Sequence, residues 1–442
     1  MSKNLSYFLQ RIMGVSTNAF RLSPQNSDSA VANGTIRFSL PSNTLWNVKA
    51  TTLLFNASCF GVSGDDAGAR LPPAECLVDR YEVSAGGILI AQGHTMYNVL
   101  TQAKGVLSKR HVDPVLGHPE YVLKKSYVNG AGSVDLAGVA LELSAKLNEG
   151  YPSGNGQTQF GINTWEGFLG SCSVGLLDTA LLPDLVLTIF LASDNVISSV
   201  TSITVPAVGA GGARYQLKNI RLLVEAVSLG SSVYDELVAR RIAQTGYVEI
   251  FYKTYQSFID THSGSSKFQI STQSLDRVWV VHRAAGYDTQ GGLVKVASSE
   301  GSMGTAHSLY RGSMFNFALT PADDTVPCTH HLLINGSMTP NFTATSTEMY
   351  ALSRAAVESP LSYPEHRPTL EQFHANNFVL CWRFNLPGSE KESILSGIDA
   401  RSLSLQCDYR TTGVKAGDNV VIFTENSSSL RIGSNRSVEY IA

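Results

Sequence analysis

One pattern occurs twice in this chain, as FSLPSNTLWNV at residues 38–48 and as FQISTQSLDRV at residues 268–278. The two copies align without a gap. In each copy an alternating apolar run, a polar turn and a second apolar run predict a strand, a turn and a strand. We expect the shared apolar positions to lie in two equivalent cores. These positions are Phe38, Leu40, Leu45, Val48, Phe268, Ile270, Leu275 and Val278.

A second self-match follows in the same order. MYNVLTQA at residues 96–103 resembles MYALSRA at residues 349–355, with a slip of one residue at the end. The spacing of apolar residues predicts a short helix at each place, over residues 96–107 and 349–357. Self-similarity over so long a distance indicates two duplicated domains and not a solenoid of short repeats.

The remaining chain consists mostly of short alternating runs separated by Gly, Ser, Asn and Pro. Such runs predict strands. Further helices are predicted only at residues 5–13 and 233–242, so the class is all-β and not an alternating βαβ chain. The predicted strands span residues 35–40, 48–55, 187–191, 215–227, 247–252, 268–270, 278–281 and 403–409.

The charge content is low for a chain of 442 residues. Only 16% of the residues are charged and the net charge is -3, whereas a soluble domain usually has about 25% charged residues. This composition excludes a disordered charged chain and a dominant polybasic surface for nucleic acid. A weakly charged surface favours association, so we expect much of it to be covered by other subunits.

Three segments resemble the double jelly-roll major capsid proteins of tailless icosahedral double-stranded DNA viruses, such as polinton-like viruses, virophages and tecti-like phages. The first is the strand pair of residues 35–41 and 45–55. The second is the junction of residues 215–255, and the third comprises residues 332–336 and 396–405. The resemblance extends from about residue 33 to residue 440 and consists of apolar and turn patterns.

The resemblance implies two tandem eight-stranded jelly-roll sandwiches with a few inserted helices. We expect an N-terminal arm at residues 1–32, a first roll at residues 33–260 and a second roll at residues 261–442. The implied function is that of a major capsid protein, assembled inside the host cell. Homotrimers would form pseudo-hexameric capsomers that tile the icosahedral virion shell.

The resemblance also implies the partners. They are two further copies in the homotrimer, neighbouring capsomers, and penton and minor capsid or cement proteins. An internal membrane is a further candidate, and no sequence-specific binding of nucleic acid is expected. No stretch of the sequence is apolar over the length that crosses a bilayer.

The N-terminal arm carries the candidate assembly residues. Apolar residues recur there with helical spacing, which a jelly-roll strand does not require. The arm would pack against a neighbouring capsomer or an internal membrane, or dock as a terminal helix on its own subunit. The residues concerned are Leu5, Phe8, Leu9, Ile12 and Met13.

No catalytic, cofactor-binding or metal-binding residue is predicted. Residues 171–175 (SCSVG) resemble a nucleophile elbow but lack its first glycine, so a buried turn is the preferred interpretation. His330 and His331 are adjacent on a predicted strand and would point to opposite faces, which is unsuited to one metal ion. The basic residues near Lys104 favour a solvated face over a contact with DNA or an acidic neighbour.

Two alternatives remain open at this point. One is a minor capsid or spike protein of the same virus class. The other is a carbohydrate-binding or glycoside-hydrolase β-sandwich, which would require two carboxylates at catalytic separation in an aromatic-lined cleft.

Overall fold

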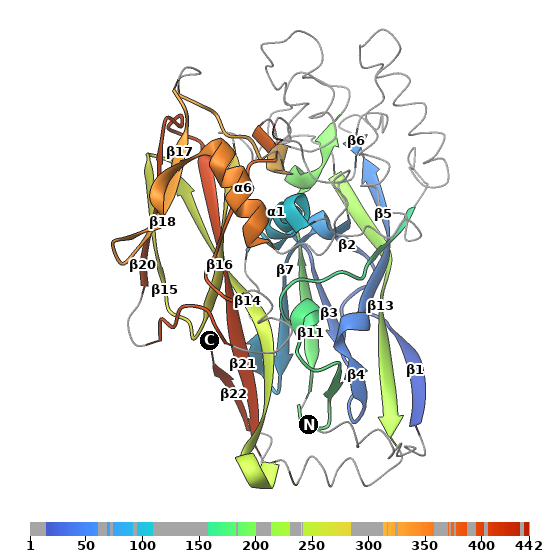
Figure 1. Ribbon diagram of the computed structural model, residues 1–442. Helices are drawn as coiled ribbons and strands as arrows, with labels where there is room; N and C mark the ends of the chain where they lie inside the picture. Colours follow the sequence, from blue (N-terminus) through green and yellow to red (C-terminus); the bar gives the residue numbers. More distant parts are fainter. Residues whose placement is uncertain are drawn as a thin grey trace, which may run out of the picture.

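The computed structural model shows two upright sandwiches side by side (Figure 1). The structure describes residues 15–60, 69–70, 74–91, 95–108, 158–182, 184–199, 214–229, 240, 242–283, 313–315, 317–322, 326–357, 370, 373–374, 377–386, 395–401, 405–433 and 437–441.

The first roll contains two antiparallel sheets and a short two-stranded ribbon. The larger sheet comprises β1 (Val15–Leu22), β2 (Ala30–Val31), β4 (Leu45–Asn47), β5 (Thr52–Phe60), β9 (Thr158–Ile162), β10 (Leu176–Asp178) and β13 (Arg214–Leu229). The smaller sheet has the order β3 (Thr35–Ser39), β11 (Val186–Leu191), β7 (Val78–Ala85) and β8 (Ile88–Ala91). The ribbon pairs β6 (Ala69–Arg70) with β12 (Ser198–Ser199).

The second roll also contains two antiparallel sheets. One has the order β14 (Tyr247–Thr261), β21 (Asn419–Gly433), β16 (Leu275–Arg283) and β19 (Val379–Arg383), and β22 (Val438–Ile441) adds to β21. The other has the order β15 (Ser265–Ile270), β20 (Leu405–Thr412), β17 (Thr329–Ile334) and β18 (Ser337–Thr345).

Helices are few and short. The α-helices with both ends described are α1 (Tyr97–Ser108), α4 (Phe168–Ser171) and α6 (Ser346–Ala356), and 3-10 turns occur at η2 (Val48–Ala50), η4 (Ala74–Leu77), η6 (Asp194–Val196) and η7 (Ser313–Phe315). Residues 242–245 are also helical, while most of the helix predicted over residues 233–242 lies outside the described residues. Helix α6 begins with a capping box, in which the Thr345 side chain and the Glu348 side chain each bond the other residue's backbone N–H. Among the described residues, no helix is long and apolar enough to cross a membrane.

The two rolls have the same topology. The order β3-β11-β7-β8 of the first roll is repeated as β15-β20-β17-β18, and the order β13-β5-β9 is repeated as β21-β16-β19. Each roll also inserts one helix at the same place, α1 after β8 and α6 after β18. The predicted duplication and the two predicted helices are therefore confirmed.

The duplicated core positions are buried as predicted. All eight are at most 8% exposed: Phe38, Leu40, Leu45, Val48, Phe268, Ile270, Leu275 and Val278. The predicted strand over residues 48–55 is wrong at its start, where the chain forms η2. The Thr51 N–H bonds the Val48 carbonyl, and the indole of Trp46 donates to the Thr51 hydroxyl over 3.0 Å, which fixes this turn.

The expected arm is partly a strand. Within residues 1–32, β1 and β2 belong to the larger sheet of the first roll, because they pair with β13. The candidate arm residues Leu5, Phe8, Leu9, Ile12 and Met13 lie outside the described residues.

Candidate functional site: the interface between the two rolls

The sheet β14-β21-β16-β19 is covered on both faces. Every residue of β16 is buried, whereas its counterpart β5 alternates between buried and half-buried positions. One face of this sheet, with Val280 and Ile422, packs in the core of the second roll. The opposite face, with Trp279 and Phe423, belongs to a core continuous with the first roll. The two rolls therefore share one hydrophobic layer.

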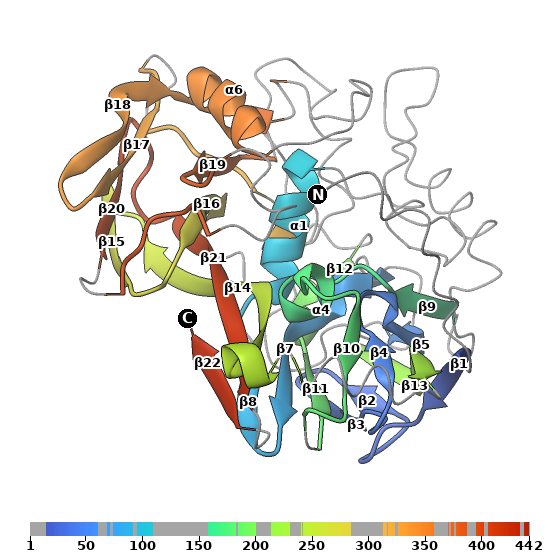
Figure 2. The same cartoon turned by 60° about the horizontal axis from the view of Figure 1, so that its bottom comes forward.

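Helix α1 lies between the rolls (Figure 2) and brings a lysine into this layer. Lys104 Nζ donates to Glu166 Oε2 over 2.8 Å and to the Tyr255 hydroxyl over 2.7 Å. It also lies 3.4 Å from Glu425 Oε2 on β21. The basic cluster predicted around Lys104 is therefore not a solvated face at this residue, because Lys104 is paired inside the chain.

Glu425 is the centre of the ionic network. Arg277 Nη1 donates to Glu425 Oε1 over 2.9 Å, and the indole N–H of Trp279 donates to Oε2 over 3.2 Å. Burial on its own would raise the pKa of Glu425, but the attraction of Lys104 and Arg277 outweighs it and holds the pKa at about 2. The carboxylate is thus charged at neutral pH and bonded to groups from both rolls.

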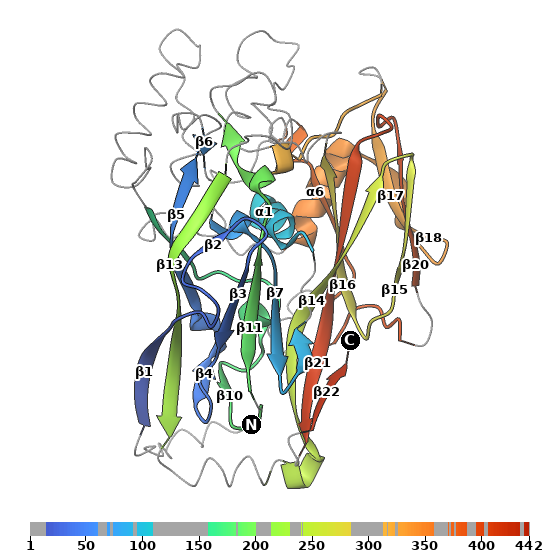
Figure 3. The same cartoon turned by 180° about the vertical axis from the view of Figure 1, so that it is seen from behind.

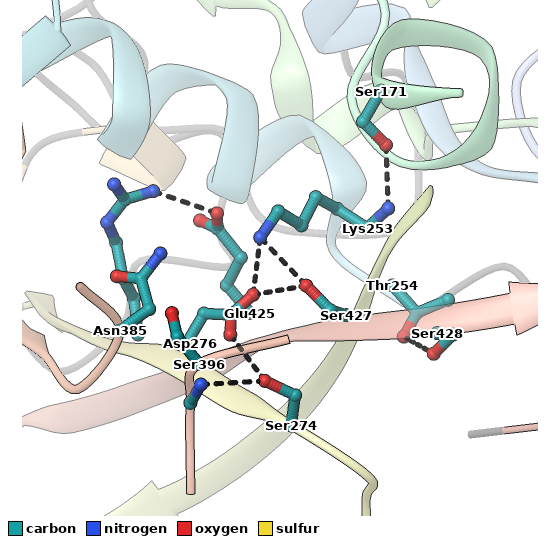
Figure 4. Close-up of polar contacts among 12 residues, drawn as sticks. Ser171, Lys253, Thr254, Ser274, Asp276, Asn385, Ser396, Glu425, Ser427 and Ser428 are labelled. Carbon is teal, nitrogen blue, oxygen red and sulfur yellow. Dashed lines mark hydrogen bonds and ion pairs between the residues drawn. The ribbon is translucent and has the colours of Figure 1, made fainter. Parts of the chain in front are cut away.

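A second polar cluster lies beside the first (Figure 4). Lys253 of β14 forms an ion pair with Asp276 and donates to the Ser427 hydroxyl over 2.9 Å. The same hydroxyl donates to Asp276 Oδ2 over 2.6 Å, and the Ser274 hydroxyl donates to Oδ1 over 2.8 Å. Asp276 lies where the pairing of β16 with β21 is irregular. This position holds a buried carboxylate, both oxygens of which accept hydrogen bonds.

The free edge of β14 is closed by serines from the first roll. The Ser173 hydroxyl accepts from the Phe251 N–H over 3.0 Å, and the Ser173 N–H donates to the Phe251 carbonyl over 2.8 Å. The Ser171 hydroxyl accepts from the Lys253 N–H over 2.7 Å. Beside them, the rings of Phe168 and Tyr252 meet edge to face at 5.0 Å. These contacts join the two rolls through backbone hydrogen bonds as well as apolar packing.

Residues 171–175, which resemble a nucleophile elbow, form a contact between the two rolls in the described structure. Both serine hydroxyls bond backbone groups. Burial raises the pKa of the Cys172 thiol between them to about 11, which disfavours the reactive thiolate at neutral pH. The preferred interpretation as a buried turn holds only for Cys172, because Ser173 and Gly175 are exposed.

Comparison with solved structures identifies the architecture. The PBCV-1 virus capsid model matches with a TM-score of 0.52 at 12% identity, over 98% of this chain and 98% of that chain. This chain is a double jelly roll. The Faustovirus major capsid protein matches with a TM-score of 0.53 at 10% identity, over 96% and 92% of the two chains. The Sputnik virophage structure matches with a TM-score of 0.51 at 11% identity, over 100% and 92%.

No protein-family model matches the sequence of this double jelly roll, and no curated protein matches it either. The likeness thus exists at the level of the fold, over nearly the whole length of each compared chain.

The second roll of the double jelly roll also holds a buried histidine cluster. The Tyr409 hydroxyl lies 2.7 Å from His282 Nε2 and 2.9 Å from His330 Nδ1, and His330 Nε2 lies 2.9 Å from the Ser346 hydroxyl. Burial lowers the pKa of His330 to about 3 and the pKa of His282 well below its ordinary value. Both rings are therefore neutral at physiological pH.

The predicted orientation of the adjacent histidines is confirmed. His330 is buried and His331 is half-buried on the other face of β17. Within the described part of the chain, no group of three His, Cys, Asp or Glu side chains is arranged to hold a metal ion.

Sequence reasoning missed the inter-roll networks. The sequence analysis does not predict a role for Glu166, Lys253, Asp276 or Glu425. A charged residue within a buried strand is the signal that could have identified Asp276 and Glu425. The repeat places Asp276-Arg277 where the first copy has Trp46-Asn47, and Glu425 is the one acidic residue in the strand of residues 419–433. Charged residues inside a buried strand are rare unless they are paired.

Proposed function

We propose that this double jelly roll is a major capsid protein whose homotrimers form pseudo-hexameric capsomers that tile a virion shell. The observation that carries the proposal is the match in fold, over nearly the full length of both chains, to the PBCV-1 capsid and to the Faustovirus major capsid protein. The proposal also covers the partners implied by the sequence: neighbouring capsomers, penton and minor capsid proteins, and an internal membrane.

The interface between the rolls suits a structural role. A shared apolar layer, a buried ionic network and a serine-closed strand edge hold the two sandwiches in one arrangement. A building block of a shell must present its lateral surfaces in a fixed geometry. The paired charges at this interface hold the two rolls in a fixed relative position. The carboxylates of Asp276 and Glu425 are each bound by a cationic side chain there.

We place the boundary between the rolls near Gly246. The sequence suggested a boundary after residue 260, which would assign β14 to the first roll. However, β14 pairs along its whole length with β21, from Tyr247 opposite Gly433 to Thr261 opposite Asn419. The second roll would then begin with β14, as the first begins with β1.

The N-terminal arm is assigned to contacts between capsomers. Deleting residues 2–14 leaves β1 intact, so we expect trimers of normal mass but no closed shells, because only the apolar arm is lost. Electron microscopy of assembly reactions measures this. A matched control replaces the polar residues Ser2, Lys3, Asn4 and Ser6 with alanine and should assemble. Shells formed as readily by the deletion variant would contradict the assignment.

The molar mass of the purified chain, measured by light scattering, tests the proposal as a whole, because a capsomer requires a stable trimer. The alternative of a glycan-binding sandwich predicts a monomer that binds carbohydrate.

A further inference from the structure

The ion pair between Lys253 and Asp276 joins two strands that do not pair with each other. Lys253 lies on β14 and Asp276 lies on β16, and both strands pair with β21, which runs between them (Figure 3). The side chain of Asp276 is 2% exposed and that of Lys253 is 16% exposed. An amine and a carboxylate are thus held in contact inside the protein, where little water is present to solvate either charge.

One hydroxyl connects the two charged groups. The Ser427 hydroxyl accepts from Lys253 Nζ over 2.9 Å and donates to Asp276 Oδ2 over 2.6 Å. The Ser427 N–H donates to the Ser274 carbonyl over 2.9 Å, which fixes the backbone of Ser427 beside Asp276. Ser427 can therefore carry a proton from the amine to one oxygen of the carboxylate.

The other oxygen of Asp276 has a donor of its own. The Ser274 hydroxyl donates to Asp276 Oδ1 over 2.8 Å, and the Gly397 N–H donates to the Ser274 hydroxyl over 3.0 Å (Figure 4). A side chain does not fit at position 397, because a Cβ there would lie 2.6 Å from Asp276 Oδ1 and 2.5 Å from Ser274 Oγ. Two aligned donors therefore stabilise negative charge on Oδ1, as donors do in an oxyanion hole.

We propose that Lys253 and Asp276 condense to an isopeptide bond, an amide between the two side chains that forms within the folded chain. The Lys253 ammonium passes one proton through Ser427 to Asp276 Oδ2, and the neutral amine attacks Asp276 Cγ. As the C–N bond forms, negative charge develops on Oδ1, where Ser274 donates. The bond from Cγ to Oδ2 then breaks, and Oδ2 leaves as water with a second proton from the nitrogen. No oxidant or other reactant is needed.

Burial and fixed geometry both favour this condensation. Two charges in the interior carry a desolvation cost that a neutral amide does not carry. The fold also holds the amine against the carboxylate, so the step needs no bimolecular encounter and gains the advantage of an intramolecular reaction.

Lys104 provides a comparison within the same chain. Its Nζ contacts two carboxylates, with Glu166 Oε2 at 2.8 Å and Glu425 Oε2 at 3.4 Å. Burial on its own would lower the pKa of Lys104, but Glu166 and Glu425 outweigh it and raise the pKa. An amine that is held in its protonated form is not a nucleophile. We therefore expect the bond at Lys253 and not at Lys104.

The isopeptide bond anchors β14 to the centre of the second roll. The Lys253 N–H bonds the Ser171 hydroxyl of the first roll, so the residue that forms the covalent link also contacts the other roll. With the bond in place, β14 cannot separate from the second roll, even where its hydrogen bonds to β21 open. The link adds a covalent tie to the block at the position where the two rolls meet.

Intact-mass spectrometry of the denatured full-length chain tests the proposal. We expect a mass lower than that of the sequence by one water molecule. Trypsin should leave Lys253 uncleaved and yield residues 242–267 joined to residues 268–277. Lys253→Arg and Asp276→Ala should have their full sequence masses. Lys267→Arg, at an exposed position of β15, is the matched control and should retain the loss of water.

Ser427→Ala tests the proton relay. When the chain is sampled during cell-free synthesis, the joined form should appear more slowly by on the order of a hundredfold, the usual contribution of a positioned proton carrier. An unchanged rate would refute this role of Ser427. Circular dichroism verifies that the variant is folded.

Two results would overturn the bond itself. One is a full sequence mass for the unchanged chain after prolonged incubation in the folded state. The other is a loss of water without the joined tryptic peptide, which would place the dehydration elsewhere. Because the bond forms within one chain, neither result depends on whether the chain is a trimer.

Discussion

Replacing Glu425 with glutamine is expected to lower the free energy of unfolding by about 3–5 kcal/mol, the usual cost of removing one partner from a buried ion pair. The side chain of Glu425 is 2% exposed and contacts Lys104 and Arg277, which come from different rolls. Glutamine keeps the size but removes the charge, so two buried cations lose their common partner. Urea denaturation at pH 7 measures the loss.

A control for this substitution is an ion pair between β14 and β21, the strand that also carries Glu425. Glu249 Oε1 lies 3.1 Å from Arg431 Nε, but both side chains are partly exposed, at 25% and 34%. Glu249→Gln should therefore cost less than about 1 kcal/mol, as is typical of ion pairs near the surface. Equal losses for the two variants would show that the buried network does not hold the rolls together.

Acidification below pH 6.5 is expected to destabilise the second roll through its buried histidines. Burial depresses the pKa of His330 to about 3 in the folded chain, while the unfolded chain titrates near 6.5. Between these values the unfolded state binds the additional proton. Stability is therefore complete above about pH 6.5 and falls by about 1.4 kcal/mol per pH unit for this residue as the pH decreases toward 3.

The histidine prediction is measured by urea denaturation at pH 7, 6 and 5. His330→Gln keeps a polar side chain near Tyr409 and Ser346 and should make the pH dependence shallower by one proton. Burial lowers the pKa of the half-buried His331 as well, so His331→Gln should also make the slope shallower, but less than His330→Gln does. Stability that is constant between pH 7 and pH 5 would contradict neutral burial of this cluster. A loss confined to lower pH would instead indicate Glu425, whose pKa is held at about 2.

The fold could be predicted because each copy of the repeat contains, within a few neighbouring residues, the alternation that identifies its strands. Phe38 and Phe268 mark equivalent strands, and the alternating residues around them already distinguish the buried face from the exposed face. Strand β1 was not predicted because half of its sequence, VSTNAFRL, is polar without a regular alternation, and its residues lie on an exposed edge. Pairing with β13, some two hundred residues later, determines its conformation, and no local pattern contains that information.

The inter-roll site could not be predicted for the same reason. Lys104 and Glu425 are separated by 321 residues in the sequence, and their contact depends on how the two rolls meet. The composition did carry a general signal. A chain with only 16% charged residues has a weakly charged surface, which favours association with other subunits.

The molar mass of the purified chain in solution, measured by light scattering, tests the central claim most directly. The account predicts a stable species of three times the 47.5 kDa chain mass, with hexagonal outlines when the same sample is viewed by negative-stain microscopy. A 47.5 kDa monomer at all concentrations, particularly one that binds glycans, would contradict the account.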